Sequence, residues 1–336
     1  MDVGASQQVF HIPVMRPSHF GFIPVAAEMK RFKNILVGVD LSGGDRYVCA
    51  DLNPQTSEAV RRALWLAKMN PARVTFCFAL DISAPAKKLL EKERVEGTVI
   101  EQANRELEKL VALAEDEGVV AGCRVFVGAS WIELIRQVLK ENHDLVVVGT
   151  RQLGRFKGWL IGSTGIKLLR KCPCPVWVTQ PQPQDRIRSI LVAHDLEPVS
   201  DLAMEIGCSM AQLQDAQLHI LHATEYPELD YVFPARVSSE DIVSYRAKAE
   251  QHIAAQLERF QLARPAHVEI VTPPAHNAIL NSIERHNVDL LVMGTVSRTG
   301  IPGFITGNTA EQLLPQIPCS IIAVKPSGFK SPVTLE

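Results

Sequence analysis

The sequence predicts an α/β fold with two tandem Rossmann-like domains, each a five-stranded parallel sheet with helices on both faces. The first observation behind this prediction is the length of 336 residues, which allows two domains of the usual ~100–200 residues. The second is an internal repeat, because Lys33–Asp40 resembles Arg188–Asp195 and Asp144–Thr150 resembles Asp289–Thr295. The third is the alternation of short Val, Ile and Leu runs with helical patterns, which is typical of strands buried on both faces.

The spacing between matching segments indicates the domain boundaries. The offset is 155 for the first pair of segments and 145 for the second, so repeat one carries about ten extra residues, which fit best in the loop-like stretch Ser42–Pro54. We expect domains at residues 33–180 and 188–326, joined by a Pro- and Gln-rich linker at residues 181–187. Residues 1–32 form an N-terminal extension without the apolar segment of a signal peptide, and residues 327–336 form a tail.

In repeat one, apolar runs of strand length alternate with apolar residues at helical spacing. The strands are predicted at Ile35–Val39, Val74–Leu80, Cys123–Val127, Asp144–Val148 and Pro175–Thr179. The helices are predicted around Val60, Ala63, Leu64 and Ala67, around Ile100, Ala103, Leu107, Leu110 and Ala114, and at Trp131–Lys140 and Thr164–Arg170, with a Gly-rich loop before the last helix.

Repeat two follows the same order. Its long helix is marked by Ile242, Ala249, Ile253, Leu257 and Phe260. Its strands are predicted at Ile190–His194, Gln217–His222, Val268–Val271, Leu290–Met293 and Ser320–Val324.

Composition narrows the partners and the compartment. The 35 Lys and Arg residues nearly balance 37 Asp and Glu, so nothing favours nucleic acid or an anionic membrane surface as a partner. No apolar run approaches the ~18 residues of a membrane-spanning helix. The seven cysteines are odd in number and scattered through apolar runs, so we expect no disulfide framework and a reducing, cytoplasmic location.

Three features of each repeat should meet at the carboxyl ends of the strands, where open α/β sheets bind ligands. An acid, Asp40 or Asp195, follows the first strand, and a glycine, Gly149 or Gly294, ends the fourth. A short polar segment then begins a helix, whose free N–H groups and partial positive charge suit phosphate. Taken singly, such a glycine is more often a turn and such a segment more often a helix cap. The polar segments are Gly162-Ser163-Thr164 and Gly307-Asn308-Thr309.

These segments resemble the signature of the universal stress protein family, G-x2-G-x9-G-[ST]. The likeness extends from Gly149 to Val176 in repeat one and from Val292 to Gln312 in repeat two, where the run at residues 307–312 is most similar to the tandem, E-type branch. It covers about residues 33–325. The resemblance implies domains of the adenine nucleotide alpha hydrolase-like fold. It also implies that these domains self-associate, within one chain or in a homodimer, through edge-to-edge pairing of their last strands, Val176–Val178 and Ile321–Val324.

The resemblance also implies a site for ATP or AMP, with or without Mg²⁺, because many members bind these nucleotides and others do not. By position, the acids would face adenine and ribose, and alanines at the ends of the second strands would line the adenine pocket. The strand-ending glycines would let ribose and phosphates approach. The polar segments would hold the phosphates. The implied residues are Val39, Asp40, Ala79, Gly149, Gly162, Ser163 and Thr164 in repeat one, and His194, Asp195, Ala223, Gly294, Gly307, Asn308 and Thr309 in repeat two.

Both repeats depart from the signature, and their charges differ. The second signature glycine is Gln152 in repeat one and Ser297 in repeat two, and a side chain there can hinder a phosphate. Asn308 replaces the signature Ser or Thr. The basic residues of repeat one, Arg151 among them, would make a phosphate prefer site one on Coulombic grounds. A solvated helix face explains the same basic residues equally well. Repeat one has Arg151, Arg155, Lys157, Lys167, Arg170 and Lys171 in this segment without an acid, whereas repeat two has Arg298 and Glu311.

Two functions follow from these features. The first is a regulatory, nucleotide-binding stress protein with slow ATP hydrolysis at most, and the alternative is an adaptor of the same fold with degenerate sites. We identify no catalytic residues and no metal ligands, because His219 and His222 should point to opposite faces of one strand. Cys172 and Cys174 are expected to pack in the core rather than to react.

Overall fold

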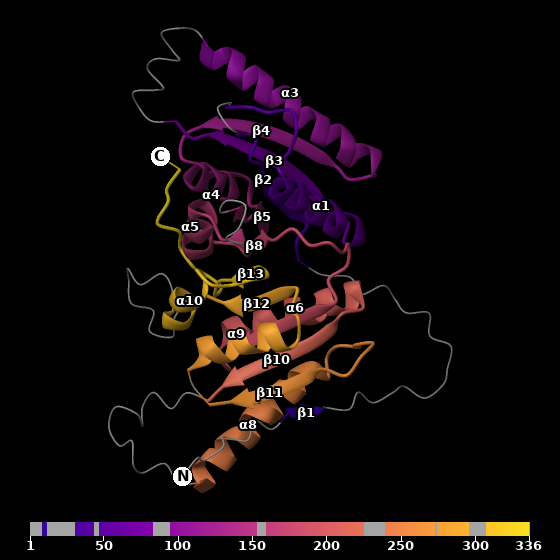
Figure 1. The fold of residues 1–336 in the computed structure, drawn as a ribbon, viewed down its shortest axis with the longest axis vertical. Coiled ribbons are helices and arrows are strands. Elements are labelled where there is room, and N and C mark those ends of the chain that lie inside the picture. Colours follow the sequence, from indigo (N-terminus) through magenta and orange to yellow (C-terminus); the bar gives the residue numbers. More distant parts are fainter. Residues whose placement is uncertain are drawn as a thin grey trace. The chain divides into compact units, whose positions relative to one another are not determined.

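The computed structural model describes residues 9–11, 31–43, 47–82, 95–152, 159–224, 239–272, 274–295 and 307–335 (Figure 1). The chain divides into two compact units. The repeat-one unit comprises Met29–Pro183 and Leu314–Glu336, and the repeat-two unit comprises Met1–Glu28 and Gln184–Leu313. Each unit is therefore assembled from two separate stretches of sequence.

The repeat-one unit contains the five parallel strands that the sequence predicts. In sheet order they are β8 (Val176–Thr179), β5 (Leu145–Gly149), β2 (Asn34–Gly38), β3 (Arg73–Leu80) and β4 (Ala121–Val127). The helices between them are α1 (Pro54–Met69), α3 (Val95–Asp116), α4 (Ser130–Glu141) and α5 (Ser163–Lys171). Because the chain adds strands first on one side of β2 and then on the other, right-handed crossovers place α1 and α3 on one face and α4 and α5 on the opposite face (Figure 1).

The segment predicted as a Gly-rich loop before α5 contains additional structure. Strands β6 (Arg151–Gln152) and β7 (Trp159–Leu160) pair antiparallel to form a small hairpin. The loop prediction was therefore wrong at both ends of this segment. Such short strands depend on pairing with each other, and two residues are too few to show an alternating pattern.

The repeat-two unit repeats this arrangement with four parallel strands. In sheet order they are β11 (His267–Val271), β10 (Gln217–Ala223), β9 (Ser189–His194) and β12 (Leu290–Gly294). Its helices are α6 (Pro198–Gln214), α8 (Ser239–Leu257), α9 (Ala275–Arg285) and the short α10 (Asn308–Leu313). A strand from the N-terminal extension, β1 (Val9–His11), lies antiparallel to β11, with His11 opposite His267.

The last strand of repeat two, β13 (Ser320–Val324), belongs to the repeat-one unit. It lies antiparallel to β8, with Ile322 opposite Trp177. The backbone N–H of Gln180 donates to Oγ of Ser320 at 3.0 Å beside this pairing. The predicted edge-to-edge contact of the two last strands is therefore confirmed, and it forms within one chain.

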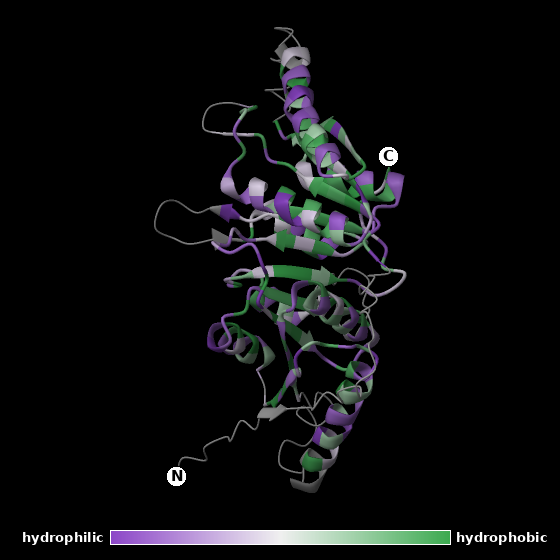
Figure 2. Ribbon diagram, turned by 90° about the vertical axis from the view of Figure 1, so that its right-hand side faces the viewer, coloured by the Kyte–Doolittle hydropathy of each residue, from purple (hydrophilic) through white to green (hydrophobic). Residues whose placement is uncertain are grey.

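The strands are apolar because both faces of each sheet are covered (Figure 2). Val146, Val147 and Trp177 of the repeat-one unit are fully buried, as are Leu191 and Val192 of the repeat-two unit. Among the described residues, none of the helices combines the length and the apolar character that a bilayer crossing requires.

Candidate functional site

A cavity of about 480 Å³ opens beyond the carboxyl ends of β2 and β5 in the repeat-one unit. The order of the sheet reverses between these two strands, since the chain adds β3 on one side of β2 and β5 on the other. Such a switch point is where open α/β sheets bind ligands. All the residues predicted for site one line this cavity: Val39, Asp40, Ala79, Gly149, Arg151, Gly162, Ser163 and Thr164.

The turn after β2 fixes the acid of site one at the cavity wall. The N–H of Val39 donates to the carbonyl of Cys77 at 2.8 Å, which continues the β2–β3 ladder one residue beyond β2, to the buried Val39. Asp40 follows and is exposed, and its Oδ1 accepts hydrogen bonds from both the N–H and the hydroxyl of Ser42. The carboxylate is thus held where a ligand hydroxyl can donate to it.

The beginning of α5 presents hydrogen-bond donors to the same cavity. Gly162 is the N-cap, and no side chain of the described residues caps this end of the helix. The first intrahelical bond runs from the N–H of Ile166 to the carbonyl of Gly162, so the N–H groups of Ser163, Thr164 and Gly165 precede the helical ladder. The first turn contains no acid. These amides and the helix dipole together favour an anion at this point.

Gly149 has a packing role that the sequence did not reveal. A Cβ atom at this position would lie 2.5 Å from the carbonyl oxygen of Gln55, at the beginning of α1. The corresponding Gly294 lacks room in the same way, because its Cβ would lie 2.9 Å from Cγ1 of Val199 on α6. In both repeats the glycine therefore lets the first helix pack against the end of the fourth strand.

The basic residues of the segment 149–171 are divided between the cavity and a helix surface. Arg151 lines the cavity. The Nζ atoms of Lys167 and Lys171 lie 5.4 Å and 4.5 Å from the ring centre of Trp131, in cation–π contacts between α5 and α4. These two lysines therefore match the helix-face interpretation. Arg155, Lys157 and Ser297 lie outside the described residues. Gln152, which replaces the second signature glycine in repeat one, ends β6, and its effect on phosphate binding stays a prediction.

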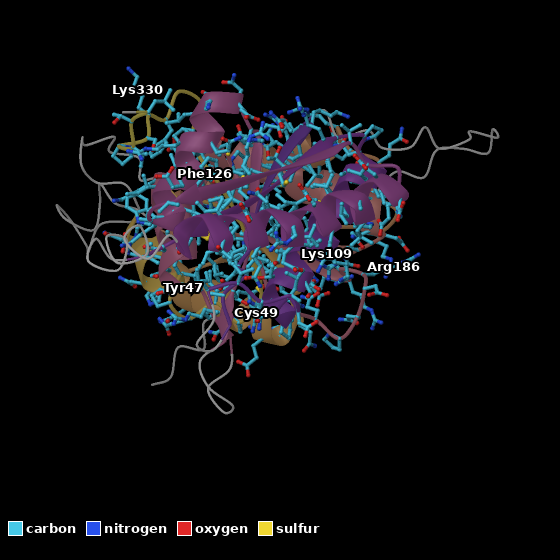
Figure 3. All side chains as sticks on the ribbon, turned by 90° about the horizontal axis from the view of Figure 1, so that it is seen from above. Tyr47, Cys49, Lys109, Phe126, Arg186 and Lys330 are labelled. Carbon is cyan, nitrogen blue, oxygen red and sulfur yellow. The ribbon has the colours of Figure 1, made fainter. Side chains whose placement is uncertain are left out.

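The loop between β2 and α1 supplies cavity residues that the sequence did not identify. Tyr47 lines the cavity and is half exposed, and Figure 3 labels it with Cys49 from the same loop. Oδ1 of Asn53 accepts a hydrogen bond from the N–H of Thr56 at 2.8 Å and so caps α1. The Asn-Pro pair before a helical pattern signals this cap, and helix starts near a switch point are natural cavity walls.

The residues predicted for site two occupy corresponding positions in the repeat-two unit. His194, Ala223 and Gly294 are the last residues of β9, β10 and β12. Asp195 follows β9, and its Oδ1 accepts hydrogen bonds from the N–H of Glu197 and the hydroxyl of Ser200. Gly307, Asn308 and Thr309 lie at the beginning of α10.

Site two suits phosphate less well than site one. Its helix, α10, has only six residues, whereas α5 has nine. Glu311 lies in the first turn of α10, where its charge opposes an anion. The repeat-one helix has no acid in that turn. The two repeats therefore share a backbone plan and differ in their electrostatics.

His194 of site two is directed into the protein. The N–H of Leu196 donates to its Nδ1 at 3.1 Å, and its Nε2 lies 3.3 Å from Oδ1 of Asp201. Burial lowers the pKa of His194 to about 4, so the ring is neutral near pH 7. Its carbonyl contacts Nδ1 of His222 at 2.8 Å. His219, by contrast, stacks against the ring of His286, in agreement with the prediction that His219 and His222 point to opposite faces.

The two cysteines of the Cys-Pro-Cys motif lie in the core. Cys172 and Cys174 are buried, and their sulfur atoms are 3.6 Å apart. Contact with the Cys172 thiol, together with burial, raises the pKa of Cys174 well above its usual value. A thiol that stays protonated is a poor nucleophile and metal ligand, so the packing role predicted for this pair agrees with the structure.

Comparison with known proteins gives one family. The model of the universal stress protein family matches residues 31–180 and 186–325. Universal stress protein E of Photorhabdus laumondii is 24% identical over 325 residues, which cover 91% of this chain and 98% of that protein. Universal stress protein E of Escherichia coli K12 is 28% identical over 307 residues, which cover 86% and 96%.

Solved structures share the fold over most of the chain. A functionally unknown protein from Pseudomonas aeruginosa is 21% identical, with a TM-score of 0.64 and coverage of 88% of this chain and 93% of that chain. A universal stress protein from Archaeoglobus fulgidus is 20% identical, with a TM-score of 0.59 and coverage of 88% and 98%.

Proposed function

Because the chain belongs to the universal stress protein family and carries two of its domains in tandem, we propose that it is a cytoplasmic, regulatory stress-response protein that binds ATP or AMP in the repeat-one cavity. The observation that carries this proposal is the convergence of Asp40, Arg151 and the uncapped beginning of α5 on one cavity. Its volume of about 480 Å³ lies within the ~300–1,000 Å³ of small-molecule sites.

Each part of the cavity suits a different part of the nucleotide. The apolar side chains of Val39 and Ala79 offer a surface for the adenine ring. The carboxylate of Asp40 can accept hydrogen bonds from ribose hydroxyls. The amides at the beginning of α5 and the guanidinium of Arg151 can donate to phosphates, which carry Mg²⁺ with them in ATP.

The lining is better suited to binding than to catalysis. Among the described residues that line the cavity there is no His or Lys to act as a general base or acid. Asp40 and Asp81 supply the carboxylates, and Oδ1 of Asp40 is already engaged by Ser42. We therefore propose slow ATP hydrolysis at most.

Repeat two favours the alternative function, an adaptor domain with a degenerate site. Glu311 lies in the first turn of α10, which has only six residues. The negative charge of Glu311 and the shortness of the helix both reduce what a phosphate could gain there. The proposal is therefore one nucleotide per chain, bound in repeat one.

Calorimetric titration of the full chain with ATP and Mg²⁺ tests this assignment. Ser163→Asp places a carboxylate at the beginning of α5, and repulsion between it and the phosphates should weaken binding at least about tenfold. The matched variant Asn308→Asp makes the corresponding change in repeat two and should leave the affinity unchanged. Equal affinities for wild type and Ser163→Asp would show that α5 does not hold the phosphates. If wild type releases no heat and gains no thermal stability at millimolar ATP, the adaptor function is correct for both repeats.

A further inference from the structure

Three side chains that can ligate a metal ion converge in the repeat-two unit. They are His194 from the end of β9, Asp201 from the first turn of α6 and His252 from α8. One candidate ligand atom from each lies within 4.8 Å of the other two. Because these residues come from three separate elements, the fold alone brings them together.

The spacing of the ligand atoms approaches that of a tetrahedral site. Oδ1 of Asp201 lies 3.3 Å from Nε2 of His194 and 3.1 Å from Nε2 of His252. Four ligands at ~2.0–2.1 Å from a zinc ion would be about 3.3–3.4 Å apart. A small closing movement of His252 toward His194 would therefore complete three vertices.

The buried member of the cluster is not satisfied by the protein alone. The His194 side chain is fully buried, and its Nε2 has no hydrogen-bond partner among the described residues although it faces Asp201. An unsatisfied ring nitrogen in the interior costs free energy, which a bound ion would recover.

Gln256 supplies a candidate for the fourth vertex. Its Nε2 contacts Oδ1 of Asp201 and lies 3.0 Å from Nε2 of His252, while its Oε1 is buried without a hydrogen-bond partner among the described residues. The two ends of an amide have the same shape, so rotation of the amide would direct Oε1 at the same point. A water molecule can take this position instead, because Asp201 and His252 are partly exposed.

The charge of the cluster also favours a cation. The described contacts of the Asp201 carboxylate are with His194, His252 and Gln256 rather than with Lys or Arg. Asp195 and Glu197 add two carboxylates in the turn before α6. Imidazole nitrogen with carboxylate oxygen is a ligand set for zinc, cobalt or nickel, whereas magnesium and calcium prefer oxygen alone.

We infer that repeat two binds one divalent transition-metal ion of the zinc type through Nε2 of His194, the carboxylate of Asp201 and Nε2 of His252, with Gln256 or water as the fourth ligand. Ion binding places the ring proton of His194 on Nδ1, so it breaks the hydrogen bond from the N–H of Leu196. The metal bond and the compensation of the Asp201 charge offset this loss.

Repeat one provides an internal comparison. Val39 takes the place of His194 at the end of its first strand, and Ser57 takes the place of Asp201 when the helix-starting Pro54 and Pro198 are aligned. Neither Val nor neutral Ser is a usual ligand for zinc. The metal site is therefore a property of repeat two, and it is separate from the nucleotide site that we propose in repeat one.

Equilibrium dialysis tests this inference. The untagged full chain is dialysed against micromolar Zn²⁺ in excess Mg²⁺ and without nucleotide, and the bound zinc is counted by mass spectrometry. Wild type should bind one zinc ion per chain. His252→Ala and Asp201→Asn should each weaken binding at least about tenfold, since each removes or weakens one ligand. Both side chains are partly exposed, so both variants should fold. His276→Ala, which removes a histidine of α9 outside the cluster, and Ser163→Asp, which alters only the nucleotide site, should bind zinc like wild type.

The absorption spectrum with Co²⁺ in place of zinc distinguishes this site from the cysteines. Tetrahedral cobalt with nitrogen and oxygen ligands should show visible d–d bands without thiolate charge transfer, and these bands should disappear in His252→Ala. Absence of zinc from wild type, zinc affinity equal to that of wild type in both His252→Ala and Asp201→Asn, or a thiolate band in the cobalt spectrum would each overturn the inference.

Discussion

Gly149 shows how one residue can serve the fold and the site together. The carbonyl oxygen of Gln55 occupies the space where a Cβ atom would project, so the beginning of α1 approaches the end of β5 closely. That approach also forms one wall of the cavity, because Gln55 and Thr56 line it. A glycine at this position is therefore needed for packing before any ligand is considered.

Gly149→Ala should destabilise the repeat-one unit. The added methyl group would lie 2.5 Å from Gln55 O, and relieving that overlap by moving backbone should cost about 1–3 kcal/mol of the free energy of unfolding. Urea denaturation measures this change. Gly122→Ala in β4 is the matched control, since a Cβ there would have no atom of the described residues within 4 Å. Equal stability of the two variants would show that α1 does not pack as closely as the structure indicates.

Sequence reasoning pointed to residues that line the repeat-one cavity because they recur at fixed positions in both repeats. Asp40 and Gly149 have counterparts in Asp195 and Gly294, and this recurrence separated them from other loop residues. Tyr47 belongs to the extra loop of repeat one and has no counterpart, so the comparison of repeats could not reveal it.

Asp201 and His252 were missed for a different reason. They are distant in sequence and meet only because α6 packs against α8.

At the scale of elements, the longer strands and helices were predicted with small errors at their ends. The predicted strand Cys123–Val127 begins two residues earlier in β4, and the predicted helix Trp131–Lys140 extends by one residue at each end in α4. Burial on both faces produces the continuous apolar runs, so the pattern was strong. The strands β1, β6 and β7 were missed, because two or three residues carry no periodicity.

Lys325 connects the end of β13 to α5. Its Nζ donates to the carbonyl of Leu169 in the last turn of α5 at 2.5 Å and lies 5.3 Å from the ring centre of Phe329. The side chain is buried, and burial lowers the pKa of Lys325 to about 7. The unfolded chain has the usual lysine pKa and therefore binds more protons than the folded chain between pH 7 and about 10.5.

This difference in proton binding predicts that Lys325 makes stability rise with pH. The free energy of unfolding should increase by about 2 kcal/mol between pH 7 and pH 9 on account of this residue, with no contribution to the slope well below pH 7. Lys325→Met should remove that part of the slope, whereas Lys330→Met, which changes an exposed lysine five residues further along the chain, should keep it (Figure 3). Urea midpoints at several pH values under reducing conditions make the comparison. Parallel profiles for wild type and Lys325→Met would contradict the assignment.

At the scale of the whole molecule, duplication has produced two domains with one backbone plan and different chemistry. Repeat one has an uncapped helix beginning with no acid in its first turn and a cavity that Arg151 lines. Repeat two has a short helix with Glu311 in its first turn and a cluster of His194, Asp201 and His252 near the end of β9. The formal net charge of -2 conceals this contrast. We propose that the first repeat serves an anionic nucleotide and the second a cation.

One nucleotide should bind to each chain, in repeat one. Native mass spectrometry of the full chain with ATP and Mg²⁺ measures this number directly. We predict one ATP bound to each wild-type chain, one to Asn308→Asp and a much smaller bound fraction on Ser163→Asp at the same ATP concentration. Two nucleotides on each wild-type chain, or one that remains on Ser163→Asp and is lost from Asn308→Asp, would contradict the claim.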